Sequence, residues 1–221
     1  MKCLKVKTFV IGPLNTNCYV VYEDREAIII DVGGDPTPII NFLDSKSIRP
    51  KLILATHGHF DHVLGVNILK KKYSIPFMIH SKDVNILKNI KEVVKNLIEM
   101  YGVKNVLGTL DYVENLEPDS TFKEEFIISV ENISLKILET PGHTLGSSCF
   151  LGHDVLFSGD TLFKGSIGRM DFGGDDKLMK ISLRKLKELP DNLIVYPGHG
   201  PVTTLGYEKI TNPFLINPDM L

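Results

Sequence analysis

The sequence predicts an α/β fold in which two sheets pack face to face with helices outside, a four-layer αββα sandwich. Short runs rich in β-branched and aromatic residues alternate with amphipathic helical patterns. The two halves of the chain repeat this theme, and each strand-rich half ends in helical segments. We expect one domain over residues 1–221, because a chain of this length can bury a sizeable core.

The first half of the chain contains five apolar runs bounded by turn residues. They predict strands over residues 8–11, 18–23, 27–32, 52–56 and 76–80. Amphipathic spacing predicts helices over 35–46, 63–73 and 81–102. The first of these helices has Asp35 as its expected N-cap and Pro36 in its first turn. The third is the longest, and Gly102 stops its pattern.

The second half repeats the pattern with more strands and one clear helix. Strands are expected over residues 126–130, 133–140, 147–151, 154–158 and 192–196. A helix is expected over 177–189.

Composition and charge argue against nucleic-acid-binding, membrane and secreted proteins. The net charge is −2 and the pI about 6.4, so we expect neither nucleic acid nor an anionic membrane as a partner. No apolar run approaches the length of a membrane span, and the N-terminus is too polar for a signal peptide. Three widely spaced cysteines, Cys3, Cys18 and Cys149, indicate reduced thiols. A soluble cytoplasmic location is therefore expected, whereas the oligomeric state is left open.

Four of the predicted strands end in residues that commonly bind metals. One runs directly into the sequence HGHFDH, and the others into Pro-Gly-His, Gly-Asp and Pro-Gly-His. Loops at strand ends are where α/β proteins collect site residues, so these endings can converge on one edge. The candidate ligands are His57, His59, Asp61, His62, His143, Asp160 and His199.

The HGHFDH sequence can serve two ions. Alternation along the chain directs His57 and His59 to one ion and Asp61 and His62 to a second. Without a cation, four ionisable groups in six residues at a partly buried edge would be costly. Imidazole nitrogens suit Zn²⁺ or Fe²⁺, and carboxylates can bind or bridge them. Seven N/O ligands are too many for one tetrahedral ion, and they indicate a catalytic rather than a structural site.

Other notable residues are interpreted as structural. His80 ends a short strand and His153 lies in a turn, so each is expected to be a histidine satisfied by hydrogen bonding. Asp31 ends the strand over 27–32 and is expected to tie down the loop VGGD that starts at Val32. Cys149 is expected to pack inside its strand.

The chain resembles the metallo-β-lactamase superfamily in four motifs that occur in the same order. These are THGHFDH from Thr56, PGHT from Pro141, SGDTLF from Ser158 and PGHG from Pro197. Within that superfamily it is similar to short glyoxalase II-type hydrolases, on the segments GSIGRMDF and PGHGPVTTLGYEKITNPFL. The resemblance covers nearly the whole chain, and it implies the metallo-β-lactamase fold with a dinuclear metal centre.

The resemblance also implies roles for the ligands. The first metal would be held by His57, His59 and His143, and the second by Asp61, His62 and His199. Asp160 would bridge the two. The implied cofactors are two divalent ions, zinc first, with iron or a mixture as alternatives.

The implied reaction is hydrolysis of a small acyl thioester such as S-lactoylglutathione. A hydroxide bridging the metals would attack the carbonyl, and a thiolate would leave. Asp61 would be catalytic, because it binds a metal and can orient the hydroxide. Arg169 would bind a substrate carboxylate; a plain surface arginine is the alternative.

Several departures from the family pattern bear on specificity. Lactamases of the superfamily commonly have cysteine where Asp160 stands, which disfavours lactam hydrolysis. Full-length glyoxalase II adds a helical domain that grips glutathione, whereas only 22 residues follow His199. Where those enzymes have lysine and tyrosine, this chain has Arg169 and Asp171. A rival reading is a mononuclear-iron persulfide dioxygenase, whose GRxDF loop resembles GRMDF here. The sequence leaves the acyl group, the thiol carrier and the metal open.

Overall fold

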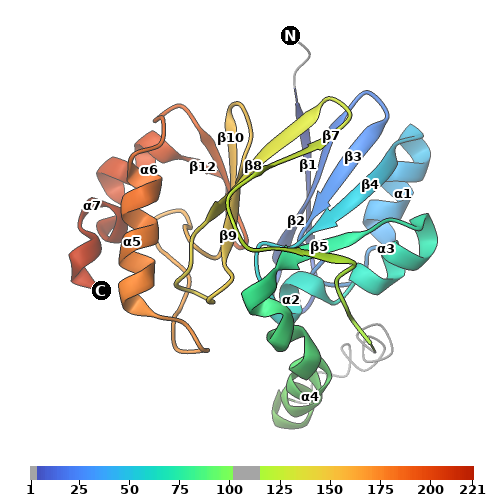
Figure 1. The fold of residues 1–221 in the computed structure, drawn as a ribbon, viewed down its shortest axis with the longest axis horizontal. Coiled ribbons are helices and arrows are strands. Elements are labelled where there is room, and N and C mark those ends of the chain that lie inside the picture. The colour runs from blue at the N-terminus through green and yellow to red at the C-terminus, as the bar shows by residue number, and fades with distance from the viewer. Residues whose placement is uncertain (1–3, 102–114) are drawn as a thin grey trace. The chain divides into compact units, whose positions relative to one another are not determined.

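The computed structural model describes residues 4–101 and 115–221 (Figure 1). Its contacts divide the chain into two compact units. The N-terminal unit runs to Phe122 and includes Ser129–Ile133, and the C-terminal unit comprises Lys123–Ile128 and Ser134–Leu221. Each unit carries its own sheet and helices, and the expectation of a single domain stays a prediction.

The sheet of the N-terminal unit has its strands in sequence order. The strands are β1 (Lys5–Ile11), β2 (Thr16–Glu23), β3 (Glu26–Ile30), β4 (Arg49–Leu54), β5 (Phe77–His80) and β6 (Ser120–Phe122). The first three pair antiparallel, and β3 to β6 pair parallel. The ends of β3, β4 and β5 therefore meet at one edge of the sheet, which is the edge where Asp31 and the HGHFDH sequence begin.

Helices pack against this sheet, and their buried side chains form one apolar core with those of the sheet. They are α1 (Thr37–Lys46), α2 (Phe60–Val63), α3 (Val66–Tyr73) and α4 (Val84–Tyr101). Ile39 and Leu43 of α1 and Leu69 of α3 join Val20 and Ile53 of the sheet in one buried cluster. In Figure 1, α1 and α3 lie beside β4 and β5. The amphipathic faces predicted from the sequence are thus the faces that bury.

Two helix predictions need correction in the N-terminal unit. The helix expected over 63–73 is observed as α3, which starts at Val66 after Gly65; the short helix α2 before it was not predicted. A Cβ at Gly65 would lie 2.2 Å from the carbonyl oxygen of Gly34. The two backbone segments approach so closely here that only glycine fits. Helix α1 starts one residue late, with Pro36 rather than Asp35 at the N-cap. The Asp35 carboxylate still accepts from the Thr37 N–H, at 3.0 Å.

The long helix predicted over 81–102 is observed as α4, preceded by a 3₁₀ turn at Ser81–Asp83. Leu87, Ile90 and Val94 are buried, as their spacing predicts. The predicted stop, Gly102, lies outside the described residues. Among the residues that the structure describes, no helix is both long and apolar enough to cross a membrane.

The second sheet has the order β12-β11-β10-β9-β8-β7. Its strands are β7 (Ile127–Val130), β8 (Ile133–Glu139), β9 (Ser148–Leu151), β10 (Val155–Gly159), β11 (Ile194–Pro197) and β12 (Thr203–Thr204). Strand β9 runs antiparallel to both β8 and β10, and β11 is parallel to β10. Strands β8, β10 and β11 therefore end at the same edge, and these are the three strands that His143, Asp160 and His199 follow.

Helices α5 (Asp176–Lys187), α6 (Leu205–Thr211) and α7 (Pro213–Ile216) cover the second sheet (Figure 1). Met179, Leu183 and Leu186 of α5 pack in one buried cluster with Leu156 and Val195 of the sheet. The Asp175 carboxylate caps α5 by accepting from the Leu178 N–H, at 2.9 Å. This cluster is the C-terminal unit's own core.

The two described cysteines are free and buried. Burial raises the pKa of the Cys18 thiol and raises that of Cys149 to about 11. Cys149 lies in β9, as expected. Both side chains therefore behave as small apolar groups, not as reactive thiolates. Cys3 lies outside the described residues.

Candidate metal centre

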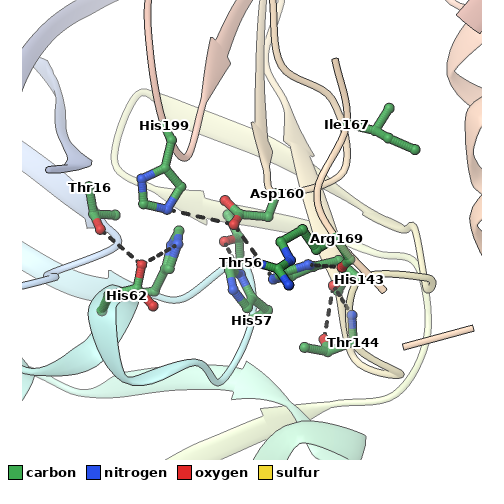
Figure 2. Close-up of polar contacts among 12 residues, drawn as sticks. Thr16, Thr56, His57, His62, His143, Thr144, Asp160, Ile167, Arg169 and His199 are labelled. Atoms are coloured by element: carbon green, nitrogen blue, oxygen red, sulfur yellow. Dashed lines mark hydrogen bonds and ion pairs between the residues drawn. The ribbon is translucent and has the colours of Figure 1, made fainter. Parts of the chain in front are cut away.

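The loop after β4 gathers four of the predicted ligands within the N-terminal unit. The rings of His57 and His59 meet edge to face, with centroids 4.8 Å apart. The His57 and His62 ring centroids are 4.0 Å apart. From helix α2, the Asp61 Oδ2 lies 3.5 Å from the His62 Nε2. A short strand-end loop and one helical turn thus place three imidazoles and a carboxylate in one cluster, of which Figure 2 labels His57 and His62.

A buried carboxylate, Asp31, fixes the orientation of His62. It accepts from the Thr56 N–H at 2.8 Å, from the Thr56 hydroxyl at 2.7 Å and from the His62 Nδ1 at 2.9 Å. With the proton on Nδ1, the lone pair of His62 is on Nε2, the nitrogen nearer Asp61. A carboxylate behind an imidazole is the usual support of a metal-binding histidine. The expectation that Asp31 ties down the loop after Val32 was wrong, because its side chain bonds to Thr56 and His62.

Two further residues support this cluster, and sequence analysis missed both. The Thr16 hydroxyl, at the start of β2, donates to Asp61 Oδ2 at 3.1 Å (Figure 2). Asp83, fully buried at the end of the 3₁₀ turn before α4, accepts from the Gly58 N–H at 2.8 Å. Gly58 lies between His57 and His59, so Asp83 holds the backbone that carries both imidazoles. Thr16 and Asp61 are 45 residues apart in the sequence, and Gly58 and Asp83 are 25 apart. No local sequence pattern could therefore have indicated either contact.

The C-terminal unit brings together the other three predicted ligands. Asp160 Oδ2 lies 3.5 Å from His143 Nε2 and 3.6 Å from His199 Nε2 (Figure 2). The three residues follow β8, β10 and β11, whose common direction delivers them to one edge. Two imidazole nitrogens on one carboxylate oxygen form a donor set suited to a divalent cation.

The loop after Ile167 supports His143 from behind. The His143 Nδ1 donates to the carbonyl oxygen of Arg169 at 2.5 Å, which puts the ring's lone pair on Nε2. The preceding residue must be glycine, since a Cβ at Gly168 would lie 2.0 Å from the carbonyl oxygen of Asp160. The Gly168 N–H donates to that same oxygen at 3.0 Å. Both units therefore hold a histidine in the tautomer that a metal requires.

A buried network ties α6 to the loop after Asp160. The Glu208 carboxylate, with no exposed surface, accepts from the Gly165 N–H at 2.7 Å and from the Thr203 hydroxyl at 2.7 Å. Asn212 donates to Glu208 at 3.0 Å and to the carbonyl oxygen of Phe163 at 3.2 Å. The Phe163 ring meets His199 edge to face, with centroids 6.0 Å apart. Sequence analysis did not identify this network.

The Arg169 side chain pairs with Asp171, two residues along the chain. Its Nε donates to Asp171 Oδ1 at 2.9 Å, and its Nη2 donates to Asp171 Oδ2. The guanidinium lies over the Phe172 ring, 4.8 Å from the centroid. The hydrogen bond from Arg169 lowers the pKa of Asp171, and Asp171 raises the pKa of Arg169. The role of Arg169 as a substrate clamp stays a prediction.

The structure supports the structural reading of His80, whereas the hydrogen bonding expected of His153 stays a prediction. The His80 Nδ1 accepts from the Lys82 N–H at 3.2 Å and so caps the 3₁₀ turn before α4. Its ring meets Phe122 edge to face. His153 is exposed in the turn between β9 and β10. Neither histidine is among the ligand groups described above.

Comparisons with known proteins are consistent with this geometry. The sequence model of the Metallo-beta-lactamase superfamily matches residues 11–199. The chain is 34% identical over 219 residues to the protein named Hydroxyacylglutathione hydrolase GloC of Haemophilus influenzae, covering 96% of this chain and 98% of that one.

Two solved structures are also similar over nearly their whole length. The BLEG-1 B3 metallo-beta-lactamase has a TM-score of 0.84 and 36% identity, with 96% of this chain and 99% of that one covered. TTHA1623, solved in a di-iron-bound form, has a TM-score of 0.79 and 32% identity, with 94% and 99% covered.

Proposed function

Because the chain belongs to the metallo-beta-lactamase superfamily, we propose that it is a metal-dependent hydrolase of small acyl thioesters, with S-lactoylglutathione as the first substrate to test. The observation that carries the proposal is the ligand set: five histidines and two aspartates at strand ends, with His62 and His143 held from behind in the metal-binding tautomer. The likeness to GloC supports the choice of a thioester.

The proposed centre holds two divalent cations. His57, His59 and His143 would bind the first, and Asp61, His62 and His199 the second, with Asp160 between them. Seven donors exceed the four of one tetrahedral ion, which supports two ions. Zinc is the first choice for an N/O donor set, and iron or a mixture is the alternative. The di-iron form of TTHA1623 supports testing iron.

When bound, such cations supply a water of lowered pKa and a Lewis acid beside the carbonyl. The chain's own residues position the reactants. Asp61, whose carboxylate Thr16 holds, would orient the attacking water. Arg169 would bind a carboxylate of the substrate. A thiol with a pKa near 8.5 leaves readily as a thiolate, so the reaction requires no dedicated general acid.

A β-lactam amide is the second candidate substrate, and the 36% identity to BLEG-1 favours it. Its nitrogen is a poorer leaving group than a thiolate and needs protonation during ring opening. We find no side chain in the described loops to which this proton transfer can be assigned. The thioester therefore remains the better match to the residues present.

The deciding experiment compares three reactions on zinc-loaded and iron-loaded protein. We expect hydrolysis of S-lactoylglutathione, followed by loss of thioester absorbance, to exceed hydrolysis of a chromogenic cephalosporin. An oxygen electrode with glutathione persulfide tests the dioxygenase alternative. Oxygen uptake on the iron-loaded protein without thioester cleavage on either metal would favour the dioxygenase. Faster cleavage of the cephalosporin than of any thioester would favour the lactamase.

A further inference from the structure

We propose that Asp171 is a specificity-determining residue that competes with the substrate for Arg169. The inference rests on the proposed function, since it concerns which thioesters that site accepts. In this arrangement, an anionic carrier such as glutathione that uses the Nε and Nη2 fork of Arg169 must displace an internal carboxylate. The chain is therefore tuned toward thioesters whose carrier is neutral at this position, and it binds carboxylate-bearing carriers weakly.

The backbone holds this pair at the ligands of the C-terminal unit. The Arg169 carbonyl accepts from the His143 Nδ1, and the Gly168 N–H donates to the Asp160 carbonyl at 3.0 Å. On the far side, the Gly174 N–H donates to the Met170 carbonyl at 2.9 Å. The loop is thus fixed at both ends, and the residue beside His143 is the one that carries the guanidinium.

The Asp171 carboxylate occupies the position on Arg169 that a substrate carboxylate would take. Asp171 meets Arg169 with both oxygens, on Nε and Nη2, which is the fork arrangement by which arginine recognises a carboxylate. Phe172 packs against the guanidinium from its ring face and restricts it further. A ligand that uses the same fork has to replace Asp171, because these donors point in fixed directions.

The pairing of Asp171 with Arg169 should weaken substrate binding measurably, yet a substrate carboxylate can still displace Asp171. The two side chains are 70% and 54% exposed, so water and salt screen their attraction. Exposed pairs of this kind shift an equilibrium by up to about fivefold. A ligand that needs the unpaired guanidinium therefore binds roughly two- to sixfold more weakly than it would without Asp171.

The test uses Asp171→Asn, Arg169→Ala, and both together on the full-length, metal-loaded protein. Binding of S-hexylglutathione, a thioether that cannot be hydrolysed, is measured by calorimetry. KM is measured for S-lactoylglutathione and for the neutral thioester S-acetyl-N-acetylcysteamine. Asp176→Asn is the matched control, because it removes the same charge from an exposed position five residues away.

We expect Asp171→Asn to lower the Kd of S-hexylglutathione and the KM of S-lactoylglutathione about two- to sixfold. The KM of the neutral thioester should change by less than about twofold, and Arg169→Ala in the Asp171→Asn background should abolish the gain. Arg169→Ala alone should weaken binding by no more than about twofold, because the guanidinium is already occupied.

The inference is wrong if Asp171→Asn leaves the Kd unchanged or raises it, or if no variant binds S-hexylglutathione. An equal gain from Asp176→Asn would also overturn it, since that result assigns the effect to net charge. Failure of the proposed function is distinguishable: no thioester would be cleaved by any variant, while the Kd values would still report on Arg169 and Asp171.

Discussion

At the scale of single residues, we expect Asp31 to influence metal affinity through the orientation of His62. Its Oδ2 accepts from the His62 Nδ1 at 2.9 Å, and its Oδ1 accepts from the Thr56 N–H behind the same loop. We expect Asp31→Asn to lower metal affinity about 10- to 100-fold, because the amide cannot stabilise the imidazole as a carboxylate does. Competition with a chromogenic chelator measures this loss.

Asp35→Asn is the matched control for that substitution. Asp35 lies in the following loop, is exposed, and bonds to Thr37 rather than to a histidine. Its variant should keep the affinity of the unmodified protein. Equal losses from the two substitutions would show that the orientation of His62 does not govern metal affinity.

A second prediction at this scale separates ligands from other histidines. Asp160→Asn should lose bound metal and nearly all turnover, because a neutral amide bridges two cations poorly. His153→Ala, on the surface, should match the unmodified protein in metal content and turnover. His80→Ala should keep its metal and lose about 1–2 kcal/mol of unfolding free energy, because it removes a buried cap.

Elemental analysis and chemical denaturation distinguish these outcomes. Retention of metal by Asp160→Asn together with its loss from His80→Ala would reverse the ligand assignment.

The candidate ligands could be picked out from the sequence, whereas the residues that hydrogen-bond to them could not. His57 to His62 and Asp160 stand out because ionisable side chains follow apolar strands within a few positions. Asp31 reaches Thr56 and His62 only through the pairing of β3 with β4. Asp83 reaches Gly58 only because α4 packs beside the loop after β4. Such contacts depend on strand order and register, which single-sequence patterns do not specify.

At the scale of elements, the short helix α6 supports the loop after Asp160. It has seven residues and no predictable period, yet Glu208 on it and Asn212 directly after it hold the loop that starts at Phe163. We expect Glu208→Gln to lower the free energy of unfolding by about 1.5–3 kcal/mol, since hydrogen bonds to a buried charge are lost. It should also weaken metal binding, because Phe163 packs on His199.

Urea denaturation and chelator competition measure both effects, with Glu188→Gln as the control. Glu188 is an exposed residue at the end of α5, so its substitution should change stability by less than about 0.5 kcal/mol. A stability loss from Glu208→Gln with unchanged metal affinity would confine α6 to a structural role.

The elements that sequence analysis missed share a physical reason. Strands β6 and β12 have three and two residues, and α7 has four. Segments this short span about one period of two or 3.6 residues, too few to show a repeating pattern, so tertiary contacts rather than local pattern specify them. The break between α2 and α3 has the same origin, because it follows from the close approach of Gly65 to Gly34.

At the scale of the whole molecule, the predicted α/β class and metallo-β-lactamase fold are confirmed by the family match and by the structural neighbours. The fold could be predicted because of two features of the sequence. Apolar runs of period two alternate with helices of period 3.6, and each sheet collects its ligand-bearing strand ends at one edge. The same strand ends carry the candidate ligands, whose assignment to metals stays a prediction.

The last prediction concerns metal content and its effect on stability. We expect about two divalent ions per chain, because seven donors from two units exceed the needs of one. Each ion that binds only the folded chain adds about 4 kcal/mol to the free energy of unfolding at 1,000 times its Kd. Removing two such ions with a chelator should therefore lower the Tm by roughly 16–32 °C for a chain of this size. In Asp160→Asn the same treatment should shift the Tm much less, since that chain has little metal to lose. Elemental analysis beside calorimetric melting provides the check. One ion per chain after supplementation with zinc and with iron would refute the dinuclear centre.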